Sequence, residues 1–251
     1  MPVLPGAEPF ASDGGRTGAL LVHGFTGTPQ SMRPWAEHLA AAGLTVRLPR
    51  LPGHGTTWRE MNLTRWQDWY GEAERAFDDL RGRCDSVFVM GLSMGGTLSL
   101  RLAEERASEV AGLVLVNPSL LTQNPAARLL PLLQWFVPSV KAIGNDVKAE
   151  GVTEQAYDRT PVKAAASLSR LWAKTTADLG RIVAPILLFR SAEDHVVEPA
   201  SARLLRAQVS SSQVEEVVLE NSYHVATLDN DRQRIFDGSL DFVRRHAEVG
   251  A

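Results

Sequence analysis

The sequence has very little cysteine. Its one cysteine, Cys84, cannot form a disulfide within the chain and cannot by itself supply a cysteine-based zinc or iron–sulfur site. Residues 1–9 contain prolines and a glutamate, and they lack the basic start and the apolar run of a signal peptide. We therefore expect a protein of a reducing compartment, the cytoplasm.

The sequence also lacks an excess of charge of either sign. Its 26 basic and 29 acidic residues give a formal net charge of -3, which offers no electrostatic basis for binding nucleic acid. The most apolar stretches, residues 129–137 and 182–189, are far shorter than the run of about 18 apolar residues that spans a bilayer. A composition with 44% hydrophobic residues is otherwise typical of globular proteins. The sequence therefore predicts a soluble protein without a transmembrane segment.

Short apolar runs alternate with longer helix-type segments over most of the chain. This pattern is typical of a parallel sheet that is covered by helices on both faces. Aromatic and aliphatic residues within 64–80 recur at spacings of three and four, which predicts an amphipathic helix there. The predicted strands lie at residues 19–22, 44–48, 87–90, 113–116, 186–189 and 214–219.

The alternation is interrupted once, between Asn117 and about Arg181, by a segment with no convincing strand. A loop of that length without structure of its own is uncommon in a compact domain. The 251 residues amount to about 1.7 times an average domain of about 150 residues. We therefore predict one α/β core, residues 1–117 and 182–251, with an inserted small helical cap at residues 118–181.

A G-x-S-x-G motif at residues 91–95 places Ser93 between a strand-type run and a helix-type segment. This is the setting of the nucleophile elbow, in which a serine sits on a sharp turn and glycines two residues away avoid clashes. The start of the following helix favours negative charge that develops beside the serine. The motif therefore predicts Ser93 as a catalytic nucleophile.

A serine nucleophile needs a base and an acid that orients the base, and both are expected after later strands. His224 directly follows the strand at 214–219, and Asp194 follows the strand at 186–189, where we prefer it to Glu193. The chain order Ser, acid, His is the one expected when the serine lies on a nucleophile elbow. The remaining histidines are interpreted as surface residues or as structural hydrogen-bonding residues: His38 and His246 in the first group, His23 and His54 in the second.

Two backbone amides are expected to stabilise the oxyanion of an ester intermediate. One belongs to the residue after the nucleophile, Met94. The other is assigned to Phe25, in the loop that follows the strand at 19–22. The alternative role of Phe25 is to line the pocket, and one residue can serve both purposes.

With these residues placed, the sequence resembles the α/β-hydrolases and, more closely, the bacterial monoacylglycerol lipases and related carboxylesterases. The resemblance implies a Ser93–Asp194–His224 triad, an oxyanion hole at Phe25 and Met94, and no metal or organic cofactor. The segments that carry the resemblance are residues 21–29, 48–55, 91–96, 193–197 and 221–229.

Within the predicted cap, residues 143–146 and 154–161 also resemble segments of that family. By this likeness Ile143 would contact the acyl chain and Glu154 would bind the glycerol hydroxyls. A carboxylate that faces a diol accepts two charge-assisted hydrogen bonds. The alternative is a solvated glutamate on the cap surface.

The resulting hypothesis is a serine ester hydrolase of the monoacylglycerol lipase type that works through an acyl-enzyme. The alternatives are a short- or medium-chain carboxylesterase, a thioesterase and, more remotely, a hydrolase-like binding protein that does not catalyse. A dehalogenase or an epoxide hydrolase would need aspartate at position 93. The expected partner is a small ester, with weak interfacial contact through the cap, and the sequence leaves the oligomeric state open. Apolar residues of the cap are expected to form the acyl chamber: Leu130, Leu133, Trp135, Phe136 and Trp172.

Overall fold

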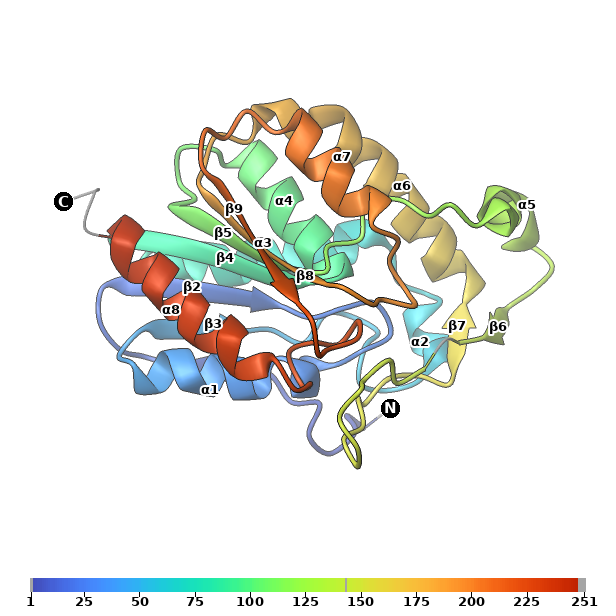
Figure 1. Ribbon diagram of the computed structural model, residues 1–251. Coiled ribbons are helices and arrows are strands. Elements are labelled where there is room, and N and C mark those ends of the chain that lie inside the picture. The colour runs from blue at the N-terminus through green and yellow to red at the C-terminus, as the bar shows by residue number, and fades with distance from the viewer. Residues whose placement is uncertain (1, 143, 248–251) are drawn as a thin grey trace.

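The protein is described from a computed structural model, which covers residues 2–142 and 144–247 (Figure 1). A seven-stranded sheet forms the centre, in the order β1-β3-β2-β4-β5-β8-β9. All neighbouring strands are parallel except β1, which runs antiparallel to β3. The strands are β1 (Phe10–Ser12), β2 (Thr17–Val22), β3 (Thr45–Leu48), β4 (Ser86–Leu92), β5 (Gly112–Val116), β8 (Ile186–Ser191) and β9 (Val214–Leu219).

The apolar runs predicted six of these strands, and each is confirmed with ends that shift by at most two residues. Their central members β2, β4 and β5 are buried almost along their whole length, as expected for a sheet covered on both faces. The sequence did not predict β1, because a three-residue edge strand carries too little periodicity to be recognised.

Helices cover both faces of the sheet (Figure 1). One face carries α1 (Arg33–Ala41) and α8 (Arg232–Ala247), and the other carries α3 (Trp66–Arg81), α4 (Met94–Glu105), α6 (Val162–Asp178) and α7 (Ala200–Gln208). The short helix α2 (Trp58–Met61) precedes α3. The amphipathic helix predicted at residues 64–80 is therefore confirmed as α3.

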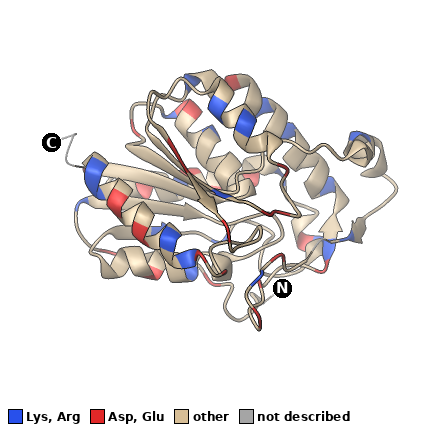
Figure 2. Ribbon diagram, in the orientation of Figure 1, with Lys and Arg blue, Asp and Glu red and all other residues tan. Residues whose placement is uncertain are grey.

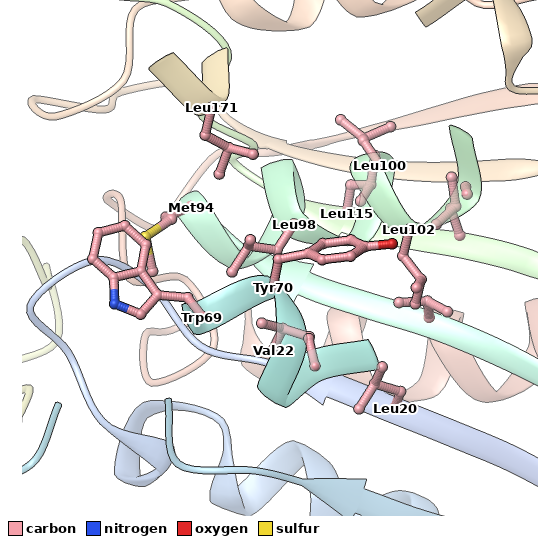
Figure 3. Close-up of a cluster of buried hydrophobic side chains, with 14 of the residues drawn as sticks. Leu20, Val22, Trp69, Tyr70, Met94, Leu98, Leu100, Leu102, Leu115 and Leu171 are labelled. Atoms are coloured by element: carbon pink, nitrogen blue, oxygen red, sulfur yellow. The ribbon is translucent and has the colours of Figure 1, made fainter. Parts of the chain in front are cut away.

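Alternation of side chains along the strands divides the core into two layers. On β2, Leu20 and Val22 belong to the cluster under α3 and α4, whereas Leu21 belongs to the cluster under α1 and α8. Figure 3 shows side chains of β2, α3, α4 and β5 converging in the first cluster, with Leu171 of α6 beside them. Helix α6, which lies within the segment that interrupts the alternation, is thus packed onto the core.

The residues between β5 and β8, 117–185, are called the inserted segment. In addition to α6 it holds a 3-10 turn (Pro125–Leu129), α5 (Leu130–Leu133), β6 (Ser139–Lys141), β7 (Arg159–Pro161) and a second 3-10 turn (Leu179–Arg181). Besides the predicted helices, the segment contains β6 and β7, which pair as an antiparallel ribbon that the sequence did not predict. Three-residue strands flanked by prolines leave no alternating pattern to detect. Figure 1 shows α5 set apart from the sheet, at the end of long connections.

Charged residues of both signs are interspersed along the helices, as the colours of the ribbon in Figure 2 show. A cluster of ionisable side chains around the buried Arg101 joins the core to the inserted segment. Arg101 of α4 donates to Glu104 at 2.9 Å and to Asp178 of α6 at 2.6 Å, and it also contacts Glu105. In the described part of the chain, no helix is long and apolar enough to cross a membrane.

Candidate active site

Ser93 occupies a sharp turn between the end of β4 and the start of α4. Its φ of 56° and ψ of -119° are strained values for a residue with a side chain. The turn is held because the Ser93 N–H donates to the carbonyl of Val116 at 3.0 Å. The predicted strand–turn–helix setting of the motif is therefore present.

The two glycines of the motif are required by close backbone approaches. A Cβ atom added to Gly95 would lie 1.9 Å from the carbonyl oxygen of Val22, and one added to Gly91 would lie 2.3 Å from the backbone of Gly95. Real Cβ atoms essentially never approach so closely. The G-x-S-x-G spacing thus reflects how tightly β2, β4 and α4 meet at the serine.

Asp194 and His224 come together at the carboxyl ends of β8 and β9. Nδ1 of His224 lies 2.8 Å from Oδ2 of Asp194, and both side chains are nearly buried. The other carboxylate oxygen, Oδ1, accepts hydrogen bonds of 2.8 Å from the N–H groups of Val196 and Val197. Because these bonds fix the carboxylate, it can hold the imidazole in one orientation and one tautomer.

The electrostatics of this pair favour a charged imidazole. Burial acts to lower the pKa of His224, but the carboxylates of Asp194, Glu154 and Asp146 outweigh it and raise that pKa above 6.5. Burial acts to raise the pKa of Asp194, but His224 and the two backbone N–H groups outweigh it, so that pKa lies below 3.8. An imidazolium formed during a reaction would therefore be stabilised here.

The loop after β2 passes directly beside the serine. A Cβ atom on Gly24 would lie 3.5 Å from Cβ of Ser93, so the peptide that carries the Phe25 amide runs close to the nucleophile. Met94 is the first residue of α4, where N–H groups have no acceptor within the helix. Both amides assigned to the oxyanion hole thus lie near Ser93, one in the loop after β2 and one at the start of α4.

His23 stabilises the loop after β2 through hydrogen bonds of both its ring nitrogens. Its Nε2 accepts a hydrogen bond of 3.2 Å from the N–H of Leu51, which leaves Nδ1 to donate to the carbonyl of Gly24 at 3.0 Å. Burial lowers the pKa of His23 to about 4, so the ring is neutral. The structural role predicted for His23 agrees with these bonds.

Ser93 and His224 both line a cavity of about 390 Å³. The inserted segment supplies its apolar wall, with Leu130 and Leu133 of α5 and Trp172 of α6. The prediction that Trp135 and Phe136 belong to this wall was wrong, because these side chains are 73% and 79% exposed. The turn of α5 has two sides, and only Leu130 and Leu133 face the cavity.

Glu154 lies on the same cavity and is partly buried. Its N–H donates to Oδ1 of Asn145 at 2.7 Å, and Oε1 lies 2.7 Å from the point that a Cβ on Gly27 would occupy. Burial raises the pKa of Glu154 to about 7, against the opposing influence of His224. The glutamate is therefore not on the outer surface. Ile143, the other predicted substrate contact, lies outside the described residues.

Asn117, at the end of β5, has a role that the sequence did not predict. Its Oδ1 accepts a bond of 2.8 Å from the N–H of Ser191, and its Nδ2 donates to Oγ of Ser191 at 3.0 Å and to the carbonyl of His224 at 2.8 Å. Asn117 thus joins the end of β8 to the histidine loop, which is formed by residues 220–231 between β9 and α8. The available signal was its position directly after a strand, where a polar side chain meets the sheet edge that carries the site.

Among the described residues, no group of three or more histidine, cysteine, aspartate or glutamate side chains is placed to hold a metal ion.

Comparison with known proteins gives a consistent set of relatives. A family model described as serine aminopeptidase, S33, matches residues 16–231. The chain is 47% identical over 251 residues to a thermostable monoacylglycerol lipase of Bacillus sp. (strain H-257), with 98% of each chain covered. It is 25% identical to a carboxylesterase of Bacillus subtilis (strain 168), with 95% of this chain and 96% of the other covered.

Among solved structures, one reported for the metagenome-derived lipolytic enzymes LipS and LipT superposes with a TM-score of 0.95. It is 45% identical in sequence, and the alignment covers 98% of this chain and 100% of the other.

Proposed function

The chain belongs to the serine aminopeptidase S33 family of α/β-hydrolases, and from its 47% identity to a monoacylglycerol lipase we propose that it cleaves monoacylglycerols into a fatty acid and glycerol. It is a serine ester hydrolase, as its lipolytic relatives indicate. The observation that carries the proposal is the cavity, in which an apolar wall and the carboxylate of Glu154 adjoin one serine. A monoacylglycerol has this same division between an acyl chain and a polar diol.

The proposed reaction is a two-step acyl transfer. Oγ of Ser93 attacks the ester carbonyl while His224 takes the hydroxyl proton, and Asp194 stabilises the resulting imidazolium. The amides of Phe25 and Met94 donate to the oxyanion. The imidazolium then protonates the departing glycerol oxygen. Water, deprotonated by His224, hydrolyses the acyl-serine and releases the fatty acid.

The proposed substrate orientation places the acyl chain along Leu130, Leu133 and Trp172. Each methylene buried there contributes about 0.8 kcal/mol to binding. Glu154 accepts hydrogen bonds from the glycerol hydroxyls, which favours glycerol esters over simple alkyl esters. The role of Ile143 as an acyl contact stays a prediction.

Residues 118–181 are proposed to act as a cap over an α/β core made of residues 1–117 and 182–251. The outer side of the cap exposes Leu132, Trp135 and Phe136, which supports weak, reversible contact with a lipid surface. Replacing both aromatic residues, W135S/F136S, should leave the turnover of a soluble short-chain ester unchanged. It should lower turnover of emulsified monoacylglycerol several-fold. If the variant turns over both substrates as fast as the wild type does, the contact with a lipid surface is contradicted. The cytoplasmic location stays a prediction.

The test compares kcat/KM for monoacylglycerols with that for alkyl esters of the same acyl chains, over a series of chain lengths. We expect a preference for the glycerol esters and a complete loss of activity in S93A. In E154Q the preference should fall about tenfold, with less effect on alkyl esters. The matched control is E150Q, an exposed glutamate of the same segment, which should behave like the wild type.

Other outcomes distinguish the remaining functions. Equal rates on glycerol and alkyl esters would point to a carboxylesterase, as in the Bacillus subtilis relative. Faster turnover of acyl thioesters would point to a thioesterase. Turnover that persists in S93A would contradict the proposed chemistry altogether.

A further inference from the structure

The inserted segment is tied to the loop that carries His224 through two carboxylates. Asp229 of the histidine loop accepts hydrogen bonds from the N–H groups of Lys148 and Ala149, at 2.7 and 2.9 Å. Asp146 of the inserted segment points the other way, toward the proposed triad. The two carboxylates make the stretch around residue 146 part of the active-site framework.

Asp146 bridges the two loops that carry Asp194 and His224. Its Oδ2 accepts hydrogen bonds from the N–H of His224 at 3.1 Å and from the N–H of His195 at 3.2 Å. Its Oδ1 lies 2.7 Å from Nδ1 of His195, and its carbonyl accepts from the N–H of Val225 at 3.0 Å. One side chain from the inserted segment therefore fixes the backbone of His224 relative to the loop after β8, which carries Asp194.

Asp146 acts on the imidazole of His224 through its negative charge, in addition to the hydrogen bonds that it accepts. The side chain is only 11% exposed, so water screens it weakly. The other charged groups near His224 are Asp194 and Glu154, and the negative charges of all three carboxylates raise the pKa of its ring.

His195, when protonated, is the group that opposes the negative charge of Asp146. It is half exposed, its Nε2 lies 3.3 Å from Glu193, and its pKa is raised above 6.5, chiefly by the bond to Asp146. The nearest lysine of the same stretch, Lys148, lies over the ring of Tyr223 instead. The effect of Asp146 on His224 therefore depends on the protonation of His195.

We propose that Asp146 is a positioning residue for the reaction, which holds the His224 backbone in place and stabilises the imidazolium with a second negative charge. The inference rests on the proposed triad of Ser93, Asp194 and His224. It assigns to the inserted segment a part in the chemical step, in addition to binding the substrate.

The test is the pH profile of kcat/KM for D146N. An asparagine keeps an oxygen for the two backbone N–H groups and removes the charge. We expect the acid limb to move about half a pH unit lower and the plateau to fall about threefold, as for a partly screened charge several ångströms away. Because one free energy causes both changes, the D146N and wild-type profiles should converge at acid pH.

A purely structural role predicts a different profile. Loss of geometry alone would lower kcat/KM by the same factor at every pH and leave the acid limb in place. The control is D229N, which weakens the same connection but is not among the groups that raise the pKa of His224. We expect D229N to lower the melting temperature without moving the acid limb.

A second variant keeps the proposal testable if D146N does not fold. H195Q removes the opposing charge at a half-exposed position, so the acid limb should move to higher pH. An acid limb that stays in place in both D146N and H195Q would overturn the inference. Activity of S93A separates this outcome from failure of the proposed function, because S93A tests the nucleophile independently of Asp146.

Discussion

The closest approach of backbone in the elbow, at Gly95, allows a quantitative prediction for G95A. The added Cβ would meet the carbonyl oxygen and carbon of Val22 at 1.9 and 2.6 Å and the carbonyl oxygen of His23 at 2.8 Å. Ordinary contact begins at 3.4 Å, so the start of α4 has to move about 1.5 Å away from β2. Since every contact is with backbone, no rotation of a side chain relieves the clash.

This displacement should reduce both stability and catalysis. Overpacked sites typically lose 1–3 kcal/mol, and we expect G95A to lie at the upper end, about 3 kcal/mol. The displacement also separates Ser93 from the loop that carries Phe25. A misplacement of about 1 Å lowers rates about 100-fold, which is the expected loss in kcat/KM. Urea denaturation followed by tryptophan fluorescence, together with hydrolysis of a soluble ester, measures both quantities.

The matched control is G71A, in the middle of α3. Apart from the neighbouring backbone of α3 itself, no atom lies within 4 Å of the Cβ that this variant adds, so the better helix propensity of alanine should stabilise the protein by about 1 kcal/mol. Its kcat/KM should equal that of the wild type. The reasoning is refuted if G95A is as stable and as active as G71A.

Three further predictions concern the pKa of His224, the hydrogen bonds of Asn117 and the pKa of Glu104. The acid limb of the wild-type kcat/KM profile should lie above pH 6.5, because the neighbouring carboxylates raise the pKa of His224 and only the neutral ring accepts the serine proton; a limb below 6.5 would contradict this. N117A removes three buried hydrogen bonds, so it should lower the unfolding free energy by about 2–4 kcal/mol and kcat about tenfold. A change in the unfolding free energy within about 0.5 kcal/mol would contradict the role given to these hydrogen bonds. Burial raises the pKa of Glu104 to about 8, so the folded protein keeps a proton that the unfolded chain releases near pH 4.5. The stability of E104Q relative to the wild type should therefore increase as pH rises from about 4.5 to about 8, and a constant difference between the two urea midpoints would exclude it.

The parts of the fold that follow a regular pattern were predictable from the sequence. Six strands are apolar runs, and α3 has its buried residues at helical spacing. The elbow was predictable because the glycines around Ser93 are demanded by backbone contacts that any such turn makes. Position after a strand was enough to select His224 and Asp194, since parallel strands deliver their ends to one edge of the sheet.

The connections that hold the site were not predictable in this way. Asn117 and Asp146 act through hydrogen bonds from a side chain to backbone of distant irregular loops. Such bonds have no period and no fixed spacing in the sequence. The exposure of Trp135 and Phe136 was missed for a related reason, because they lie in the turn after α5, and a helix of one turn has no long stripe that shows which side faces the protein.

The inserted segment leaves and re-enters the sheet between neighbouring strands, since Val116 of β5 pairs with Phe189 of β8. Because β5 and β8 are parallel, its two ends lie at opposite ends of these strands, and the sheet fixes their separation whatever lies between them. In a chain closed in this manner, a doubling of the loop length adds only about 0.6 kcal/mol of closure entropy. Natural or engineered variants can thus exchange α5 or lengthen its connections at little thermodynamic penalty, provided that residues equivalent to Asp146 and Asn117 still hold the histidine loop.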